Sequence, residues 1–306
     1  MVALQLLINA LSIGAAYSLV ALGFVLILNA TAAVNFCQGD LVMLGGFAAV
    51  TLGAYLPVPG LVLLPLVLAI MAALGMVLSA VAYFPLRRRP PETVFISTIA
   101  VGIILQNTAN ALFGPEPQAA PALVGSGELA LGPLSIGRQS LAIIVIATLL
   151  IIALHWLFSR TQFGRRLRAT AQDRDMAAAV GIRVDVMVAV TFALATALGG
   201  AAGLLLANSF FVTPTDGTNY ILKAYIAVTI GGWGSIPGAV VGALLIALFE
   251  VIYPALPIVA PALGHGSYAG LLFSQTTSTI MLDAAILLIL MFRPQGLFGE
   301  AVRQRP

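Results

Sequence analysis

Charged residues are scarce in this sequence. Asp, Glu, Lys and Arg make up 8% of its 306 residues, against roughly 25% in a soluble globular domain. With 60% of the residues hydrophobic, the surface of this chain does not all face water. The basic residues are almost all Arg, Lys223 is the only Lys, and no basic cluster lies on a soluble domain. The composition therefore argues against a nucleic-acid-binding module.

Residues that bind metals or form disulfides are also few. Cys37 is the only cysteine, so no internal disulfide forms, and its apolar surroundings favour a small buried side chain. His155 and His265 have no Cys or carboxylate partner nearby in sequence, so we expect no metal site. The chain also lacks a Gly-x-x-x-x-Gly-Lys-Ser/Thr phosphate-binding loop, and we expect no cofactor and no catalytic residue.

Long apolar runs are what the sequence has instead. Segments 61–84 and 141–158 contain no charged residue, and about 18–20 such residues cross a bilayer as a helix. Runs without apolar–polar alternation exclude a transmembrane barrel. The sequence predicts an all-α bundle of about 8–10 spans, some broken, in a single transmembrane domain over 1–306. The spans are expected at about 4–28, 38–56, 61–85, 93–113, 139–158, 186–208, 221–256 and 279–292.

Two of these segments carry signs of a break. Segment 221–256 is too long for one simple crossing and contains Gly231–Gly238 with Pro237, so we expect two helices or one broken helix. Segment 38–56 is rich in glycine and follows a polar patch. No basic residue precedes Arg87, and the first apolar run is too long for a cleavable signal, so we expect it to be the first span.

The basic residues predict the orientation of the chain. Three segments hold 12 of the 14 basic residues. These residues are Arg87, Arg88 and Arg89; Arg160, Arg165, Arg166, Arg168, Arg174 and Arg183; and Arg293, Arg303 and Arg305. The positive-inside rule places all three segments in the cytoplasm and residues 114–138 outside. Lys223, at the start of its predicted helix, is expected to extend toward the outer face.

The cytoplasmic loop at about 159–185 predicts a short helix at about 171–180, outside the membrane. Thr170 and Asp173 fit a capping box, and Gly181 fits a C-terminal cap. A helix of this kind is suited to dock into a groove of another protein, or alternatively to lie on the lipid headgroups. The residues expected to take part in docking are Arg168, Thr170, Gln172, Asp173, Arg174, Asp175, Met176, Ala177, Ala178 and Gly181.

Polar residues inside apolar segments are the candidates for a substrate pathway. They are Asn35, Gln38, Asp40, Gln106, Asn107 and Asn110. Polar and ionisable groups at bilayer depth are costly and usually mark a pathway or a paired site. The alternatives are that the first three cap a helix at the headgroup level, and that the amides bond to a neighbouring helix. Glu250 and Asp283 are interpreted as structural residues that pair with Arg or a backbone donor.

Four segments resemble branched-chain amino-acid ABC transporter permeases. Within the cytoplasmic loop, residues 169–182 resemble the coupling-helix loop of these permeases. The glycine-rich segment 231–242 resembles their late glycine-rich motif, and Arg293–Gly299 resembles their C-terminal motif. Asn35–Asp40 resembles the early motif Asn-Phe-Ala-His-Gly-Glu of the H-type subunit, with Gln38 in place of His and Asp40 in place of Glu. The resemblance implies a second permease subunit, two ATP-binding subunits that bind the ATP, and an external solute-binding protein, in a bacterial inner membrane.

The resemblance implies an importer subunit for branched-chain or related amino acids. Urea, amides or other amino acids remain alternative substrates. Two other classes of protein are alternatives. One is an ion-coupled secondary transporter, which needs no docking helix, and the other is an intramembrane enzyme acting on lipids, which needs clustered His or acidic residues. The acidic residues here are scattered.

Overall fold

A computed structural model describes residues 2–125, 127–131, 134–259, 269–292 and 296–298. Arg293, Arg303, Arg305 and His265, all named above, lie outside these residues. The longer helices are α1 (Val2–Thr31), α2 (Gln38–Tyr55), α3 (Gly60–Leu78), α4 (Pro91–Phe113), α5 (Arg138–Arg160), α8 (Val184–Phe210), α9 (Asp216–Gly231), α10 (Ile236–Val259) and α12 (Gln275–Phe292). The shorter elements are the π-helix η1 (Ser79–Tyr83), the 3-10 helix η2 (Phe84–Leu86), α6 (Gln162–Gln172), α7 (Arg174–Ala179), α11 (Ala269–Leu272), β1 (Glu128–Leu131) and β2 (Leu134–Gly137).

The prediction of a polytopic helical bundle is confirmed. Among the described residues, seven helices are long and apolar enough to cross a membrane: α1, α3, α4, α5, α8, α10 and α12. Helices α1 and α8 are mostly buried inside the chain, whereas α3, α4, α5, α10 and α12 expose much of their apolar surface. Side chains such as Val62, Ile104 and Leu287 are more than 60% exposed on these outer helices. An apolar exterior around an apolar core is what a lipid environment requires, so the chain is a multi-pass membrane protein.

The predicted break in segment 221–256 is also confirmed. Helix α9 ends at Gly231, α10 begins at Ile236, and Gly232 and Gly234 between them adopt φ of +111° and +80°. These angles favour glycine because a side chain would clash there. The two helices then pack closely: a Cβ on Gly231 would lie 2.0 Å from the Gly238 carbonyl oxygen. The glycines of this segment therefore allow both the turn and the contact.

Helices α2 and α9 are shorter than the spans around them. Helix α2 has 18 residues and α9 has 16, and both pack inside the bundle against α8 or α1. The contact between α2 and α8 depends on glycine, since a Cβ on Gly203 would lie 2.0 Å from the Val42 carbonyl oxygen. The small residues of the Gly199–Gly203 segment therefore allow tight packing of α8 against α2.

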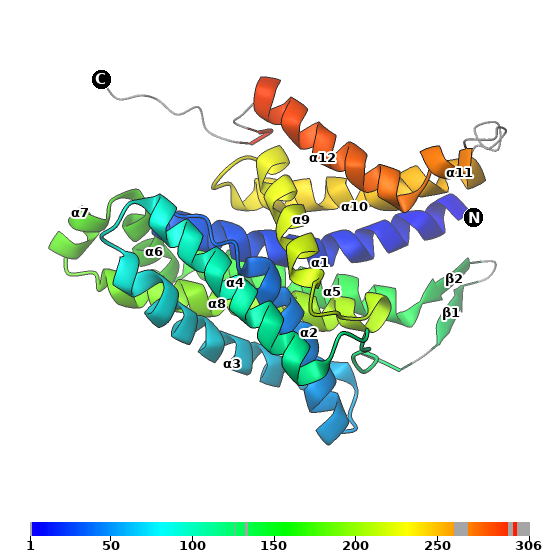
Figure 1. The fold of residues 1–306 in the computed structure, drawn as a ribbon, viewed down its shortest axis with the longest axis horizontal. Helices are drawn as coiled ribbons and strands as arrows, with labels where there is room; N and C mark the ends of the chain where they lie inside the picture. The colour runs from blue at the N-terminus through cyan, green and yellow to red at the C-terminus, as the bar shows by residue number, and fades with distance from the viewer. Residues whose placement is uncertain (1, 126, 132–133, 260–268, 293–295, 299–306) are drawn as a thin grey trace.

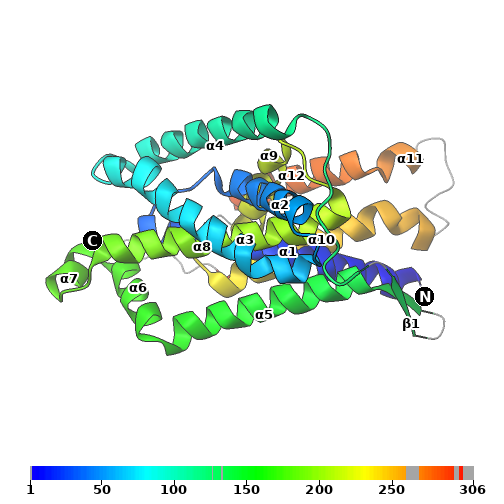
Figure 2. The ribbon, with the colours of Figure 1, turned by 90° about the horizontal axis from the view of Figure 1, so that it is seen from below.

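The two ends of the bundle differ in composition (Figures 1 and 2). One end carries the Arg87–Arg89 turn, α6 and α7. The other end carries the N-terminus, α11 and the antiparallel hairpin β1–β2. The hairpin lies within the segment 114–138 that was expected to form an outer loop. Both described Arg-rich segments thus lie at the same end, as the orientation prediction requires.

Candidate functional site

The segment between α5 and α8 forms two short helices at the Arg-rich end. The prediction of one helix at about 171–180 is wrong in its extent, because α6 ends at Gln172, the chain turns at Asp173, and α7 follows. Thr161 caps α6, with its hydroxyl accepting the Gly164 N–H at 3.2 Å. Asp173 caps α7, with its carboxylate accepting the Met176 N–H at 2.9 Å. The short helix outside the spans is therefore present, preceded by a second one.

The predicted capping box on Thr170 is wrong. Thr170 lies inside α6, where its hydroxyl donates to the Arg166 carbonyl at 3.0 Å. Asp173 takes the extended backbone of an N-cap, with φ −157° and ψ 111°. The C-terminal cap is confirmed: Gly181 has φ +83°, and its N–H donates to the Ala178 carbonyl at 3.0 Å. Asp and Thr are both good capping residues, and the continuation of α6 through Thr170 decides between them.

Most of the candidate docking residues face solvent. Arg168, Gln172, Asp173, Asp175, Met176, Ala178 and Gly181 are exposed, whereas Thr170 and Ala177 are buried. Met176 and Val180 are 64% and 72% exposed, so α7 presents apolar side chains at the tip of the molecule. The guanidinium of Arg168 donates to the Phe158 carbonyl and holds α6 against the end of α5.

Arg174, at the start of α7, ties this helix to the membrane-spanning part. Its guanidinium donates to the Ala30 carbonyl of α1 at 2.7 Å and to the Tyr83 hydroxyl of η1 at 3.0 Å. A second link lies nearby, where Arg87 forms an ion pair with Asp185 at the start of α8. The hydrogen bond to Asp185 raises the pKa of Arg87. The charges of this end thus bind the short helices and turns to the ends of α1 and α8.

Asn35, Gln38 and Asp40 are buried inside the chain, with 2%, 0% and 5% of their surface exposed. The Gln38 amide donates to the Ala195 carbonyl in the middle of α8 at 3.1 Å, and the Asn35 side chain accepts from the Cys37 thiol at 3.0 Å. Asp40 accepts from the Gln106 amide of α4 at 2.7 Å. Because Ala195 lies near the middle of α8 and Gln106 lies within α4, the cluster lies inside the bundle and joins α2 to α8 and α4.

Close packing surrounds the Asp40 carboxylate. A Cβ on Gly102 of α4 would lie 2.3 Å from one carboxylate oxygen, and a Cβ on Gly217 of α9 would lie 2.0 Å from the other. Asp40 lies in the first turn of α2, and Gly217 lies in the first turn of α9. Both helix N-termini therefore lie beside the carboxylate.

The three amides of α4 do not act together. Gln106 bonds to Asp40 and, at 3.4 Å, to the Thr218 hydroxyl of α9. The Asn107 side chain donates to the Ile103 carbonyl of its own helix at 2.8 Å and is exposed, as is Asn110. The interpretation that such amides bond to a neighbouring helix thus holds for Gln106, while Asn107 and Asn110 lie on the exposed face of α4.

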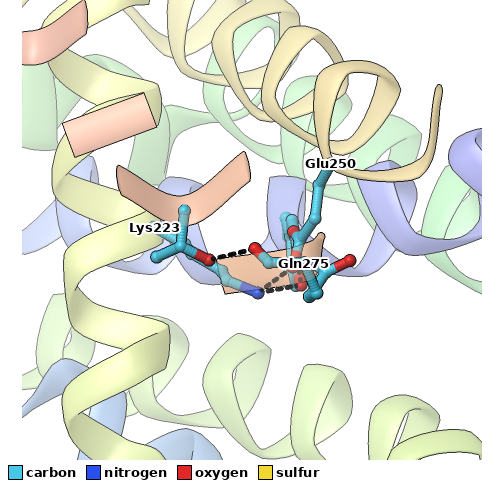
Figure 3. A network of polar contacts seen from close by, with 5 residues as sticks. Lys223, Glu250 and Gln275 are labelled. Carbon is cyan, nitrogen blue, oxygen red and sulfur yellow. Dashed lines mark hydrogen bonds and ion pairs between the residues drawn. The ribbon is translucent and has the colours of Figure 1, made fainter. Parts of the chain in front are cut away.

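A further polar cluster, which the sequence did not predict, lies between α1, α9, α10 and α12. Lys223 of α9 donates to Glu250 of α10 at 2.7 Å and to the Tyr17 hydroxyl of α1 at 2.5 Å. Tyr17 in turn donates to Glu250 at 3.1 Å, and the Gln275 amide of α12 donates to the same carboxylate at 3.1 Å. Figure 3 shows Lys223, Glu250 and Gln275 converging from three helices.

The expected position of Lys223 is wrong. It does not extend toward the outer face, because α9 begins at Asp216 rather than near Ile221, and Lys223 therefore lies at mid-helix. The Lys223 and Glu250 side chains are 22% and 13% exposed. They border a cavity of about 590 Å³, whose wall also includes Tyr17, Asn219 and Gln275. A signal was present in the sequence: opposite charges in one apolar segment must pair at bilayer depth.

Two other cavities lie along α1. One of about 300 Å³ lies nearer the N-terminal end and includes Asn9 and Ser12. Another, of about 780 Å³, lies toward the Arg-rich end between α1, α5, α6 and α10, and includes His155 and Arg168. None of the three cavities is lined by Asn35, Gln38 or Asp40. Among the described residues, no group of three or more His, Cys, Asp or Glu is placed to hold a metal ion.

Comparison with known proteins identifies the family. A family model described as "Branched-chain amino acid transport system / permease component" matches residues 6–292. The chain belongs to this permease family. It is 29% identical, over 97% of its length and 96% of the relative's, to the high-affinity branched-chain amino acid transport system permease protein BraD of Pseudomonas aeruginosa. It is 28% identical to LivH of Escherichia coli with the same coverage, and 28% identical to a probable LivH of Methanocaldococcus jannaschii, over 92% of this chain and 88% of that one.

The resemblance stated from the motifs is thereby confirmed for the permease family. A shorter match, 30% identical over 41% of this chain, is to the autoinducer 2 import system permease protein LsrC of Yersinia pestis. No solved structure matches the chain. Family membership therefore rests on the sequence, and the arrangement of the site rests on the geometry described above.

Proposed function

We propose that this chain is a substrate-conducting permease subunit of an ABC importer for branched-chain amino acids, in the inner membrane of a bacterium. The observation that carries the proposal is the capped pair α6–α7, which projects beyond the spans of a chain that belongs to the permease family. The near full-length relatives are named as branched-chain amino acid permeases, which supports that substrate class.

ATP hydrolysis is assigned to separate subunits. The chain has no phosphate-binding loop of the Gly-x-x-x-x-Gly-Lys-Ser/Thr type, so the energy must reach it through a docking surface. Helix α7 supplies one: Met176 and Val180 expose apolar side chains, and an apolar helix face fits a groove in a partner. We propose a complex with a second permease subunit, two ATP-binding subunits on the Arg-rich end and a solute-binding protein on the opposite end.

An importer of the same family for a different solute is the second candidate. The match to a permease for autoinducer 2 supports it, because that relative carries a solute that is not an amino acid. An ion-coupled secondary transporter needs no docking helix, so the exposed α7 argues against that class. Transport by the complex in liposomes, with its solute-binding protein and each solute in turn, separates the two importer readings.

Replacement of Ala178 by Arg tests the docking assignment. Ala178 is exposed on α7, so a long charged side chain would block the apolar contact without disturbing the fold. We expect the purified variant to lose its ATP-binding subunits and its transport, while its amount in the membrane stays normal. The control is Ala119→Arg, which adds the same side chain to an exposed site near the opposite end. Normal retention of the ATP-binding subunits by Ala178→Arg, together with normal transport, would contradict the proposal.

A further inference from the structure

The Lys223–Glu250 pair lies where charges are expensive. Ionisable side chains at bilayer depth usually mark a pathway or a paired site, and a buried ion pair is weak evidence for stability alone. This pair is net neutral, and each charge has a second partner: the Tyr17 hydroxyl bonds to both groups, and Gln275 bonds to Glu250. Each charge can therefore release the other and still keep a hydrogen-bond partner.

The pair is also accessible from one side. The cavity of about 590 Å³ beside it lies within the range of about 300–1,000 Å³ that small-molecule sites occupy. Its wall combines polar side chains, including those of Lys223, Glu250, Asp216 and Asn219, with apolar side chains, including those of Ile13, Leu206 and Val251. A positive and a negative group 2.7 Å apart beside an apolar wall match the two charges and the side chain of an amino acid.

A second cavity continues toward the N-terminal end of the bundle. Its wall shares Ile13, Leu206, Phe210 and Val251 with the first cavity and adds Asn9 and Ser12 of α1. Polar side chains therefore follow α1 from its first turns to Tyr17 in its middle, along two adjoining cavities. A polar solute that enters at the end opposite α7 would meet hydrogen-bonding groups before it reaches the ion pair.

We propose that Lys223 and Glu250 form a transient binding site for the zwitterionic part of an amino acid. The substrate carboxylate accepts from the Lys223 ammonium, and the substrate ammonium donates to Glu250. The aliphatic side chain lies against Ile13, Leu206 and Val251. When the substrate leaves, the ion pair closes again, so neither charge is left unpaired and binding stays weak enough for transport. This inference rests on the proposed function and names the groups that receive its substrate.

Alkylation of a reporter cysteine tests the site in the purified importer complex. Asn219 is exposed in the cavity, so Asn219→Cys is placed in a Cys37→Ser background and its rate of alkylation is measured. We expect L-leucine to slow the reaction at least tenfold. The analogues 4-methylpentanoate, which lacks the ammonium group, and 3-methylbutylamine, which lacks the carboxylate, should give no protection. The control Ser159→Cys lines the separate cavity of about 780 Å³ and should react at the same rate with every ligand.

A variant that lacks both charges of the pair provides a second test. The double variant Lys223→Met, Glu250→Leu removes both charges but keeps side chains of similar volume. If the pair has only a structural role, the helices can still pack in this variant. We expect it to lower leucine transport at least tenfold at saturating solute-binding protein, with assembly and docking of that protein unchanged. The matched control is Arg89→Met with Glu92→Leu, which removes two exposed charges of opposite sign away from the cavity and should transport normally. If the double variant of the site does not assemble, the ligand series on the intact pair decides.

The outcomes separate this inference from the proposed function. The site is wrong if the complex transports leucine but leucine does not slow the alkylation of Asn219→Cys, or if either analogue slows it as much as leucine does. It is also wrong if an assembled Lys223→Met, Glu250→Leu variant transports at the normal rate. If the complex transports no branched-chain amino acid yet another zwitterionic amino acid protects the reporter, the substrate assignment fails and the site stands.

Discussion

Replacement of Arg174 by Met should separate ATP hydrolysis from transport. The guanidinium of Arg174 joins the N-terminal end of α7 to α1 through the Ala30 carbonyl and to η1 through the Tyr83 hydroxyl. Hydrogen bonds to a charged group contribute about 1.5–3 kcal/mol each when protected from solvent. Arg174 is only half-buried, so we take the lower end for both and expect a loss of about 3 kcal/mol in the docking of α7 against α1.

A loss of about 3 kcal/mol changes an equilibrium by roughly a hundredfold, because about 1.4 kcal/mol corresponds to a factor of ten. The exposed face of α7 does not include this guanidinium, so the ATP-binding subunits should still bind. We therefore expect hydrolysis to continue while the amount of solute transported per ATP falls at least tenfold. Tyr83→Phe removes one of the two bonds and should cause a smaller loss, of about 1.5 kcal/mol.

The assay is transport and ATP hydrolysis measured on the same liposomes with loaded solute-binding protein. Arg165→Met is the matched control, because Arg165 is exposed on α6 and its loss removes a charge of the same kind. Arg174→Lys keeps the charge but not the planar fork that reaches two acceptors, so it should be intermediate. A normal ratio of transport to hydrolysis in Arg174→Met would refute a mechanical role for this contact.

Two further predictions concern the buried cluster and the orientation. Asp40→Leu removes the acceptor of the Gln106 amide and should lower the amount of folded protein, at a cost of about 1–3 kcal/mol, whereas Asp40→Asn keeps an acceptor and should fold and transport normally. Lost transport by well-expressed Asp40→Asn would instead place the carboxylate in the pathway. Single cysteines that replace Arg88 or Arg166, in a background without the native cysteine, should react with an impermeant reagent only after the cells are opened. A single cysteine that replaces Ala119 should react in intact cells. Labelling of either Arg position from outside would overturn the orientation.

The spans, and the position of the described Arg-rich segments at one end, were predictable because they depend on local composition. Apolar length identifies a crossing, and the break between α9 and α10 follows from glycines whose conformation a side chain would not adopt. The exposed cap of α7 was predictable only in part. Thr170 and Asp173 are both good capping residues, and only the continuation of α6 shows which of them starts a helix.

The polar contacts were not predictable in the same way because their partners are distant in sequence. Asp40 and Gln106 are 66 residues apart, and Lys223 and Tyr17 are 206 apart. Sequence reasoning put Lys223 at the membrane face because it started the helix at about 221, five residues late. At 1.5 Å per residue, that error moves a side chain by about 8 Å, enough to confuse the membrane surface with its interior.

The position of α1 gives the two proposals a common physical basis. This helix accepts the hydrogen bond of Arg174 at Ala30, near its end, and bonds to Lys223 and Glu250 through Tyr17, in its middle. The two residues are thirteen positions apart, or about 20 Å along one uninterrupted helix. A helix transmits a shift along its axis without losing its own hydrogen bonds, so a displacement of α7 that moves Ala30 also moves the Tyr17 hydroxyl. Because that hydroxyl bonds to both charges of the pair, such a movement changes how readily Lys223 and Glu250 separate to accept a zwitterion.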